Sequence, residues 1–217
     1  MPEPQPFLPK KGNYKGLIAY QKAECIYDIT FYFANTFLDK KDRTMDQMVQ
    51  AARSGKQNIA EGSAAGATSA ETEITLTNVA KASLQELLDD YEDYLRVRGL
   101  ERWSLEDART KHTQQFCSSH NSSSDYMELI KSRSAETIAN IAITLIHQED
   151  VMLRKLLERL QKDFEQYGGI KEQMTAARLG FRRGQQEEIE RLKAENSRFQ
   201  QRISYLESKL LEAGIKF

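Results

Sequence analysis

Residues 54–71 of this 217-residue chain read SGKQNIAEGSAAGATSAE, and this stretch decides the fold. Its Gly-Lys pair resembles part of a phosphate-binding loop. Such a loop needs a glycine five positions before the Gly-Lys pair and a Ser or Thr directly after it. The sequence has Gln50 at the first of these positions, and Gln57 follows Lys56. A phosphate loop is therefore excluded, and the stretch instead predicts the end of one helix and the start of the next.

The glycines of this stretch have structural explanations. Gly55 lies on the apolar stripe of the helix that ends in this stretch, where it lets a neighbouring helix approach closely. Gly62 is expected in the left-handed conformation that ends many helices, and Gly66 relieves the turn that follows. Thr68 or Ser69 then caps the helix that begins in this stretch, because a side-chain oxygen at that position accepts a hydrogen bond from a free backbone N–H group.

Two polar residues of this stretch, and the aromatic residues of the helix before it, lack such an explanation. Asn58 and Glu61 either satisfy backbone groups at the helix end or line a contact between subunits. Aromatic residues cover nearly all sides of the preceding helix, and a helix that is apolar all round needs burial all round. Part of this face should be core, and the rest should contact another subunit. The predicted bundle and subunit contacts are Tyr20, Tyr27, Phe31, Gly55, Asn58, Glu61 and Gly62.

The sequence on both sides of this stretch also predicts helices. All four prolines lie in the first nine residues, and alternating patterns typical of strands are scarce. Four helices are expected, over about 15–38, 45–61, 68–98 and 125–167. Gly99 and Gly168 should end the third and fourth helices. Residues 100–124 are expected to form an irregular connection with a short helix at 105–116 and a flexible serine-rich tip.

The predicted fold class is all-α. It consists of an antiparallel up-down four-helix bundle with a long fourth helix and a C-terminal coiled-coil helix. The predicted boundaries are a disordered proline-rich tail at 1–13, the bundle at 14–168 with a loop insertion at about 100–124, a basic suffix segment at 169–184 and the coiled coil at 185–217.

Apolar residues near the C-terminus recur at alternating spacings of three and four, as in a coiled coil. The predicted core positions are Ile189, Leu192, Asn196, Phe199, Ile203, Leu206 and Leu210. Asn196 occupies an a position, where asparagine selects a parallel two-stranded register at a cost in stability. Opposite charges at g and e would meet across such a pair, namely Glu188 with Lys193 and Arg202 with Glu207. The alternative is a lone helix that folds back on the bundle.

A basic segment precedes these heptads. It contains Lys171, Arg178, Arg182 and Arg183. Four cations per chain, multiplied by oligomerisation, would make several phosphate contacts. The whole chain has 31 basic and 32 acidic side chains, so no global field attracts nucleic acid. These four residues are the candidate nucleic-acid contact, and the alternative is a solvated helix surface beside a hinge.

The sequence predicts neither an enzyme nor a bound cofactor. Cys25 and Cys117 are far apart, and a reducing cytoplasm fits this cysteine usage. His112, Cys117 and His120 have a spacing that suits zinc but lack a fourth ligand, so we expect no metal. No Ser or Cys has a His and an acidic residue at a spacing typical of a nucleophilic catalytic triad. No apolar run is long enough to cross a bilayer, which predicts a cytoplasmic protein without membrane contact.

Four short motifs carry a resemblance to a known family. They are Tyr20-Gln-Lys-Ala23, Gln57-Asn-Ile-Ala-Glu-Gly62, Thr68-Ser-Ala-Glu71 and Ala80-Lys-Ala-Ser-Leu-Gln-Glu-Leu87. Through them, residues 14–100 resemble the bacterial four-helix bundle proteins typified by the open reading frames inside 23S rRNA intervening sequences. Residues 157–183 resemble the suffix of a subset of that family. The resemblance implies an antiparallel up-down bundle that assembles as a homo-oligomer, commonly a pentameric ring, with no established catalytic residues.

A related bundle serves as an accessory subunit of reverse transcriptases in diversity-generating retroelements, where a basic ring surface engages nucleic acid. This chain departs from that pattern, because residues 65–98 carry three basic and seven acidic side chains. The long serine-tipped connection and the terminal coiled coil also depart from the minimal family pattern.

The function expected from these features is that of a non-catalytic homo-oligomeric scaffold or adaptor. The bundle would contact other copies of itself, and the C-terminal helix would pair chains or recruit an unidentified protein. The alternative is a nucleic-acid-binding accessory subunit. A five-fold bundle and a two-stranded coiled coil do not share symmetry, so one of the two stoichiometries is wrong or the coiled coils associate between rings.

Overall fold

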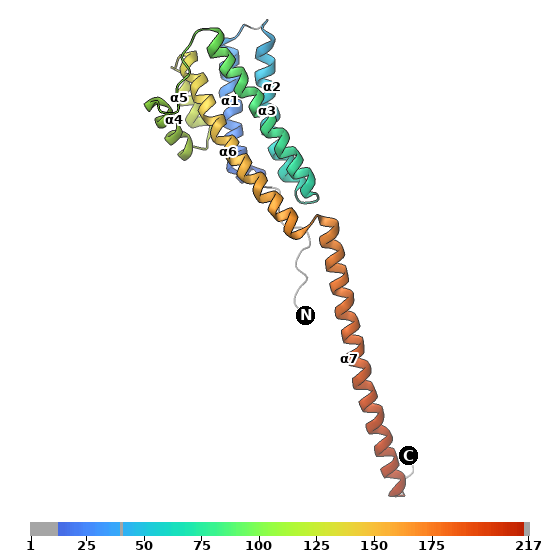
Figure 1. The fold of residues 1–217 in the computed structure, drawn as a ribbon. Helices are drawn as coiled ribbons and strands as arrows, with labels where there is room; N and C mark the ends of the chain where they lie inside the picture. Colours follow the sequence, from blue (N-terminus) through green and yellow to red (C-terminus); the bar gives the residue numbers. More distant parts are fainter. Residues whose placement is uncertain (1–12, 40, 215–217) are drawn as a thin grey trace. The chain divides into compact units, whose positions relative to one another are not determined.

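The computed structural model describes residues 13–39 and 41–214, and every regular element in this part is helical (Figure 1). The prediction of an all-α chain is therefore confirmed at the level of fold class. The elements are η1 (Tyr14–Gly16), α1 (Ile18–Phe37), α2 (Arg43–Ala65), α3 (Ala70–Val97), α4 (Ala108–Ser119), α5 (Ser123–Ile130), α6 (Ala135–Tyr167) and α7 (Ile170–Glu212).

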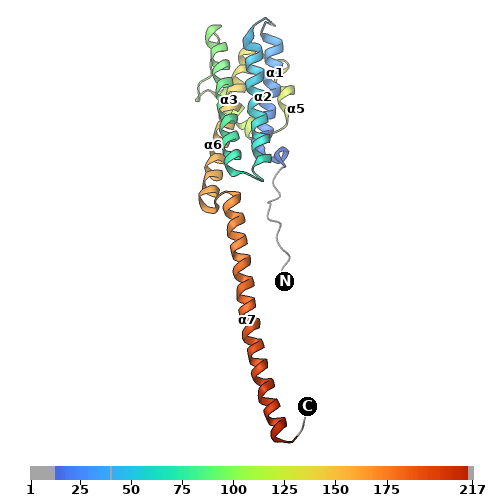
Figure 2. The ribbon, with the colours of Figure 1, turned by 90° about the vertical axis from the view of Figure 1, so that its right-hand side faces the viewer.

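The chain divides into two compact units, Met1–Ile170 and Lys171–Phe217. In the first unit, α1 packs against α2 and α6, and α3 packs against the same two helices. Figure 1 and Figure 2 both show α2 and α3 side by side. The two short helices lie outside these contacts, with α4 against α6 and α5 against α1. The four longer helices of this unit therefore enclose the core.

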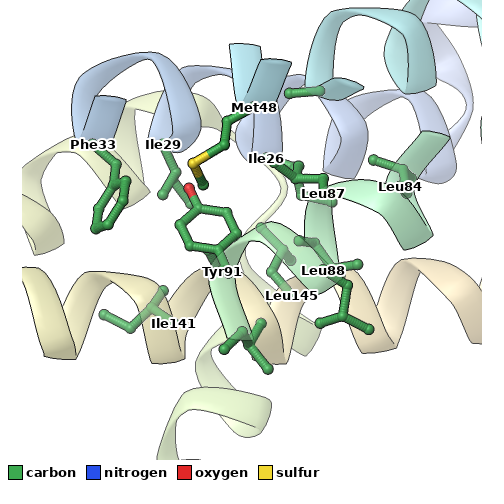
Figure 3. Packing of buried hydrophobic residues seen from close by; sticks show 14 of the residues in the cluster. Ile26, Ile29, Phe33, Met48, Leu84, Leu87, Leu88, Tyr91, Ile141 and Leu145 are labelled. Atoms are coloured by element: carbon green, nitrogen blue, oxygen red, sulfur yellow. The ribbon is translucent and has the colours of Figure 1, made fainter. Parts of the chain in front are cut away.

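The core is built from apolar side chains that point inward from all four of these helices. Tyr91 of α3 lies among Ile29, Phe33 and Met48 (Figure 3), and all four side chains are fully buried. The Tyr91 hydroxyl donates a 3.1 Å hydrogen bond to Thr30 Oγ1, so this buried polar group has a partner. Each large apolar side chain buried in this way contributes roughly 1.5–3 kcal/mol.

Several predicted helix ends are confirmed. The Ser69 hydroxyl accepts a 3.1 Å hydrogen bond from the N–H of Thr72 and caps α3. Gly99 and Gly168 follow the ends of α3 and α6 with φ angles of 64° and 68°. A side chain is strained in this left-handed region, which explains glycine at both positions.

The prediction of one continuous fourth helix over 125–167 is wrong. The chain instead forms α5, a turn and then α6. The break occurs because Ser134 starts a new helix, with its hydroxyl accepting a 3.3 Å hydrogen bond from the N–H of Thr137. The N–H of Arg133 closes the turn by donating to the Ile130 carbonyl oxygen at 2.9 Å.

The predicted irregular connection over 100–124 is also more ordered than expected. Asp107 caps α4 by accepting a 2.7 Å hydrogen bond from the N–H of Arg109, and α4 then runs to Ser119. The serine-rich tip forms helix ends, with Ser122 at the N-cap of α5. Ser123 donates a hydrogen bond to the carboxylate of Asp28, which links α5 to α1.

The second unit is formed by α7, which runs through Gly180 and Gly184 without a break. The predicted basic suffix and coiled coil are therefore parts of one helix, although they were expected as separate segments. None of the described residues of this helix is buried. The predicted tail over 1–13 lies outside the described residues except for Asn13, as do the last three residues of the predicted coiled coil.

Candidate functional sites

A cavity of about 550 Å³ opens between α1, α4, α6 and the segment that joins α3 to α4. Its volume falls in the range of ~300–1,000 Å³ typical of small-molecule sites. Apolar side chains from two helices form part of its wall, namely Ile18, Ile143, Val151 and Met152. All of these elements belong to the first compact unit.

Asn140 of α6 fixes the segment between α3 and α4 that lines one side of this cavity. Its amide oxygen accepts a 2.8 Å hydrogen bond from the backbone N–H of Trp103. Its amide nitrogen donates to the carbonyl oxygens of Glu101 at 2.8 Å and Glu136 at 2.9 Å. The buried Asn140 side chain thus supplies hydrogen-bond partners to two backbone groups of this segment, which lies outside any helix.

Basic side chains also line the cavity. Arg102 forms an ion pair with Glu92 at 2.5 Å, and its guanidinium lies 3.5 Å from the Nε2 atom of His147. Lys22 is the third basic group. Among the described residues, no Asp or Glu lines this cavity. The charged side chains that line the cavity are therefore all basic, and Glu92 pairs with one of them from outside the lining.

Lys22 joins α1 to the C-terminal end of α4. Its ammonium group donates hydrogen bonds to the carbonyl oxygens of Cys117 and His120, and a third bond of 3.3 Å to the Tyr126 hydroxyl. These three bonds use all the donors of a lysine. The carbonyl oxygens at a helix C-terminus lack partners within the helix, and a cation there is favourable. Burial lowers the pKa of Lys22.

Glu149 is an acidic residue in the same part of the core as Lys22, and the two groups interact electrostatically. Its side chain is fully buried, and neither carboxyl oxygen has a hydrogen-bond partner within the described part of the chain. Burial raises the pKa of Glu149 well above its ordinary value, and the charge of Lys22 opposes this shift only partly. The structure therefore favours the neutral acid at this position.

Three further polar atoms lack partners near the cavity. They are the indole nitrogen of Trp103, the hydroxyl oxygen of Thr110 and the amide oxygen of Asn121, all buried and without a hydrogen bond among the described residues. All three residues line the cavity. Unpaired buried polar atoms are uncommon in folded proteins, and their concentration around one cavity requires an explanation.

The predicted contact residue Gly55 has an internal role. A Cβ atom there would lie 2.7 Å from Leu84 Cδ2, so glycine permits the close approach of α2 and α3, as predicted. The prediction for Gly62 is wrong. This residue is buried inside α2, which continues to Ala65, and it is not among the glycines with positive φ. A Cβ at Gly62 would lie 3.3 Å from the Cβ of Leu76 on α3, so close helix packing explains it.

Asn58 and Glu61 make contacts within their own chain. The Asn58 amide donates to the Ser54 carbonyl oxygen at 2.9 Å and lies 3.2 Å from the Ser54 hydroxyl. That hydroxyl in turn lies 2.9 Å from the Ser83 hydroxyl on α3. Glu61 is exposed and accepts a 2.9 Å hydrogen bond from Gln57. Asn58 therefore belongs to the packing of α2 on α3, whereas Glu61 faces solvent.

The predicted aromatic contacts on α1 differ in exposure. Tyr20 is half-buried and packs edge-on against Tyr14, with 4.9 Å between ring centroids. Tyr27 lies under the ammonium group of Lys56, which is 4.3 Å from its ring centroid. Phe31 is 50% exposed and lies beside Tyr27 with 6.2 Å between centroids. Tyr27 and Phe31 thus form an aromatic surface that is exposed at Phe31 and partly covered by Lys56 at Tyr27.

The predicted coiled-coil core lies along α7, and its apolar members are exposed. Their side chains remain 38–61% accessible, although each would be buried in a coiled coil. These residues are Ile189, Leu192, Phe199, Ile203, Leu206 and Leu210. Asn196 is exposed among them. We call this stripe the α7 seam.

The predicted nucleic-acid contacts also lie on α7. Lys171, Arg178, Arg182 and Arg183 are all exposed. The first three follow at spacings of seven and four residues, which places them on one helix face. Arg183 is displaced from that face by one residue. The structure therefore brings three of the four cations together.

The zinc-like spacing does not gather a set of ligands. Cys117 is buried, His120 stacks on Phe116 with 4.0 Å between ring centroids, and His112 is exposed. Among the described residues, no group of three or more His, Cys, Asp or Glu side chains is placed to hold a metal ion.

Lys22, Glu149 and Asn140 are absent from the predicted sites. A signal for the first two exists in the sequence. Lys22 shares a helical stripe with Ile26 and Ile29, and Glu149 lies on the stripe of buried residues that continues to Leu153. A charged residue on an apolar stripe indicates either a buried polar role or a local break in the core.

Comparisons with protein-family models, curated proteins and solved structures give no match to this chain. Among the helices of the described residues, none combines the length and apolar content needed to cross a membrane.

Proposed function

We propose that this chain is a non-catalytic, homo-oligomeric helical scaffold whose copies associate through the α7 seam. The observation that supports this proposal is the exposure of a regular apolar stripe on a helix that buries none of its described residues. Apolar stripes of this kind are stabilised by pairing with a second helix, because association removes them from water.

The composition of the seam favours a parallel pair of helices. Asn196 at an a position can bond with its counterpart in a parallel two-stranded coil but would be unpaired in many other registers. Glu188 and Lys193, and likewise Arg202 and Glu207, would meet as opposite charges across the same interface. Within a single chain Glu188 bonds to Arg191 at 2.6 Å, a weak exposed pair that can exchange on assembly.

The first unit would supply a second self-contact. We propose that α1, α2, α3 and α6 form an antiparallel up-down bundle related to the 23S rRNA intervening-sequence proteins. Its partly exposed aromatic surface around Tyr27 and Phe31 would pack on another copy, in a ring such as the pentamer implied by that resemblance. Such a scaffold would act in the cytoplasm and present α7 to a partner protein or to another ring.

Native mass spectrometry of two matched variants tests association through α7. Leu206→Glu places a charge in the seam, whereas Leu211→Glu makes the same change at an exposed position outside it. We expect Leu206→Glu to lower the oligomer number and Leu211→Glu to leave it unchanged. Equal oligomers for both variants and the unmodified chain would contradict assembly through the seam.

Nucleic-acid binding is the second candidate, and the alignment of Lys171, Arg178 and Arg182 on one face of α7 favours it. Gel-shift titration with single-stranded RNA should show salt-sensitive binding. Charge reversal at Arg178, Arg182 and Arg183 should abolish that binding. The matched control reverses three exposed cations of α6, namely Lys155, Arg159 and Lys162. Equal loss in both triple variants would indicate a nonspecific charge effect and contradict a site on α7.

A further inference from the structure

We propose that the cavity between α1, α4 and α6 binds a small organic anion with an apolar body. This site is distinct from the α7 seam, and the proposal does not depend on assembly through it. Three properties of the cavity carry the inference: its apolar wall, the basic side chains on that wall and the unpaired polar atoms around it.

The wall sets the size and the apolar character of the ligand. About 550 Å³ is enough for a molecule with one or two rings or a short acyl chain. Ile18 is 55% exposed and Val151 is 40% exposed. A ligand body that covers these two side chains would remove apolar surface from water and gain affinity.

The basic side chains of the wall favour an anion. Arg102 has five N–H donors, and its exposed pair with Glu92 uses only part of this capacity. His147 lies next to the same guanidinium. Lys22 has no free donor, because its three N–H bonds serve α4 and Tyr126. The direct anchor is therefore Arg102, and Lys22 adds only a positive potential.

The unpaired atoms provide hydrogen bonds for polar groups on the ligand body. Trp103 offers an N–H donor, Thr110 a hydroxyl and Asn121 an amide. These atoms are covered in the free chain, so their side chains would rotate toward the ligand. An unpaired buried polar atom costs free energy, and a bound molecule that supplies the missing partner recovers it.

The probe for the test is 8-anilinonaphthalene-1-sulfonate, an aromatic anion of suitable size. Trp103 is the only tryptophan of the chain, so quenching of its emission reports binding at the cavity in the unmodified full-length protein. Val151→Phe should fill the mouth of the cavity and weaken binding about tenfold or more, since the ligand body loses its place. Val79→Phe alters an equally exposed valine of α3 outside the cavity and should leave affinity unchanged.

A second pair of variants tests the charge. Arg102→Met should weaken binding of the anionic probe about tenfold but should not weaken binding of N-phenyl-1-naphthylamine, which has the same rings without the sulfonate. Arg96→Met, which breaks a comparable exposed pair with Asp93, should change neither affinity.

The outcomes separate the proposal from its alternatives. Weaker binding in Val151→Phe than in Val79→Phe, together with probe-selective loss in Arg102→Met, supports the site. No quenching of Trp103, or equal affinities in the two valine variants, would overturn it. Equal effects of Arg102→Met on both probes would overturn the assignment of an anion. If circular dichroism shows that Val151→Phe does not fold, Ile18→Phe blocks the cavity from α1 instead.

Discussion

The ammonium group of Lys22 on α1 donates a hydrogen bond to the carbonyl oxygen of Cys117 near the C-terminal end of α4. The two residues are 95 positions apart in the chain. Lys22 is only 1% exposed, yet its three hydrogen bonds satisfy the charged group inside the protein. This contact ties a short helix of the insertion to the central helices of the first unit.

Removal of this ammonium group should destabilise the protein. Lys22→Met keeps the length of the side chain but removes the donor to the Cys117 carbonyl oxygen. It leaves the His120 carbonyl oxygen with the Tyr126 hydroxyl alone, at 3.0 Å. We expect a loss of about 2–3 kcal/mol in the free energy of unfolding, measured by urea titration. Lys155→Met, at an exposed position of α6, is the matched control. A loss below about 0.5 kcal/mol for Lys22→Met would show that these bonds contribute little.

The buried carboxyl group of Glu149 should make stability depend on pH. Because burial raises its pKa in the folded state, the folded chain holds a proton that the unfolded chain releases above the ordinary pKa of glutamate. Stability from this group is present below that ordinary value, about 4.3, and is lost progressively as pH rises toward the folded pKa. Unfolding free energy should therefore fall as pH rises from about 4.5 to 7.

Glu149→Gln replaces the neutral acid by an uncharged amide of similar shape and should remove most of this fall. Near pH 7 the variant should be more stable than the unmodified chain, with little difference near pH 4.5. Glu158→Gln, an exposed change on the same helix, should keep the original pH profile. A pH profile for Glu149→Gln that matches the unmodified chain would exclude Glu149 as the cause.

Close packing of α2 on α3 should make Gly55 intolerant of a larger side chain. In Gly55→Ala the new Cβ would meet the buried side chain of Leu84, at 2.7 Å from Cδ2 and 2.8 Å from Cγ. We expect a destabilisation of about 1–3 kcal/mol, despite the higher helix propensity of alanine. In a double-mutant cycle, Leu84→Ala should remove most of this cost. Additive effects of the two changes would contradict direct contact.

Replacement of Asn196 should change the specificity of assembly. Asn196→Ile makes the α7 seam fully apolar, so the association of chains should become more stable to heat while the oligomer number becomes less uniform. Sedimentation velocity and thermal unfolding at several protein concentrations measure both effects. Weaker association of the variant chains would contradict the assignment of Asn196 to the core of a two-stranded coiled coil.

Local signals in the sequence were sufficient for the helix class and for several helix ends. The Ser69 cap and the glycine stops at Gly99 and Gly168 depend on residues within one turn of the helix. Gly62 was misassigned because a glycine inside a helix and one at its end look alike in sequence. Its close neighbour Leu76 lies on another helix, and only the fold reveals that contact.

The interior sites could not be derived in the same way. Asn140 holds Trp103 across 37 positions, and no periodicity indicates which backbone segment a buried amide will bind. The cavity depends on the same contact, because it forms where the segment between α3 and α4 crosses α6. The α7 seam differs from these interior sites, because its heptad spacing is a local pattern. This pattern alone predicts which residues of α7 would contact a second helix.

Disulfide trapping at position 196 tests parallel pairing of α7 most directly. In a parallel, in-register pair the two a positions face each other closely enough for a disulfide, whereas the adjacent b positions point away. After mild oxidation, Asn196→Cys should therefore form a covalent dimer on non-reducing gels, and Ser197→Cys should remain largely monomeric. The natural cysteines, Cys25 and Cys117, are buried and should not interfere. Equal cross-linking at both positions, or none at 196, would contradict the proposed scaffold.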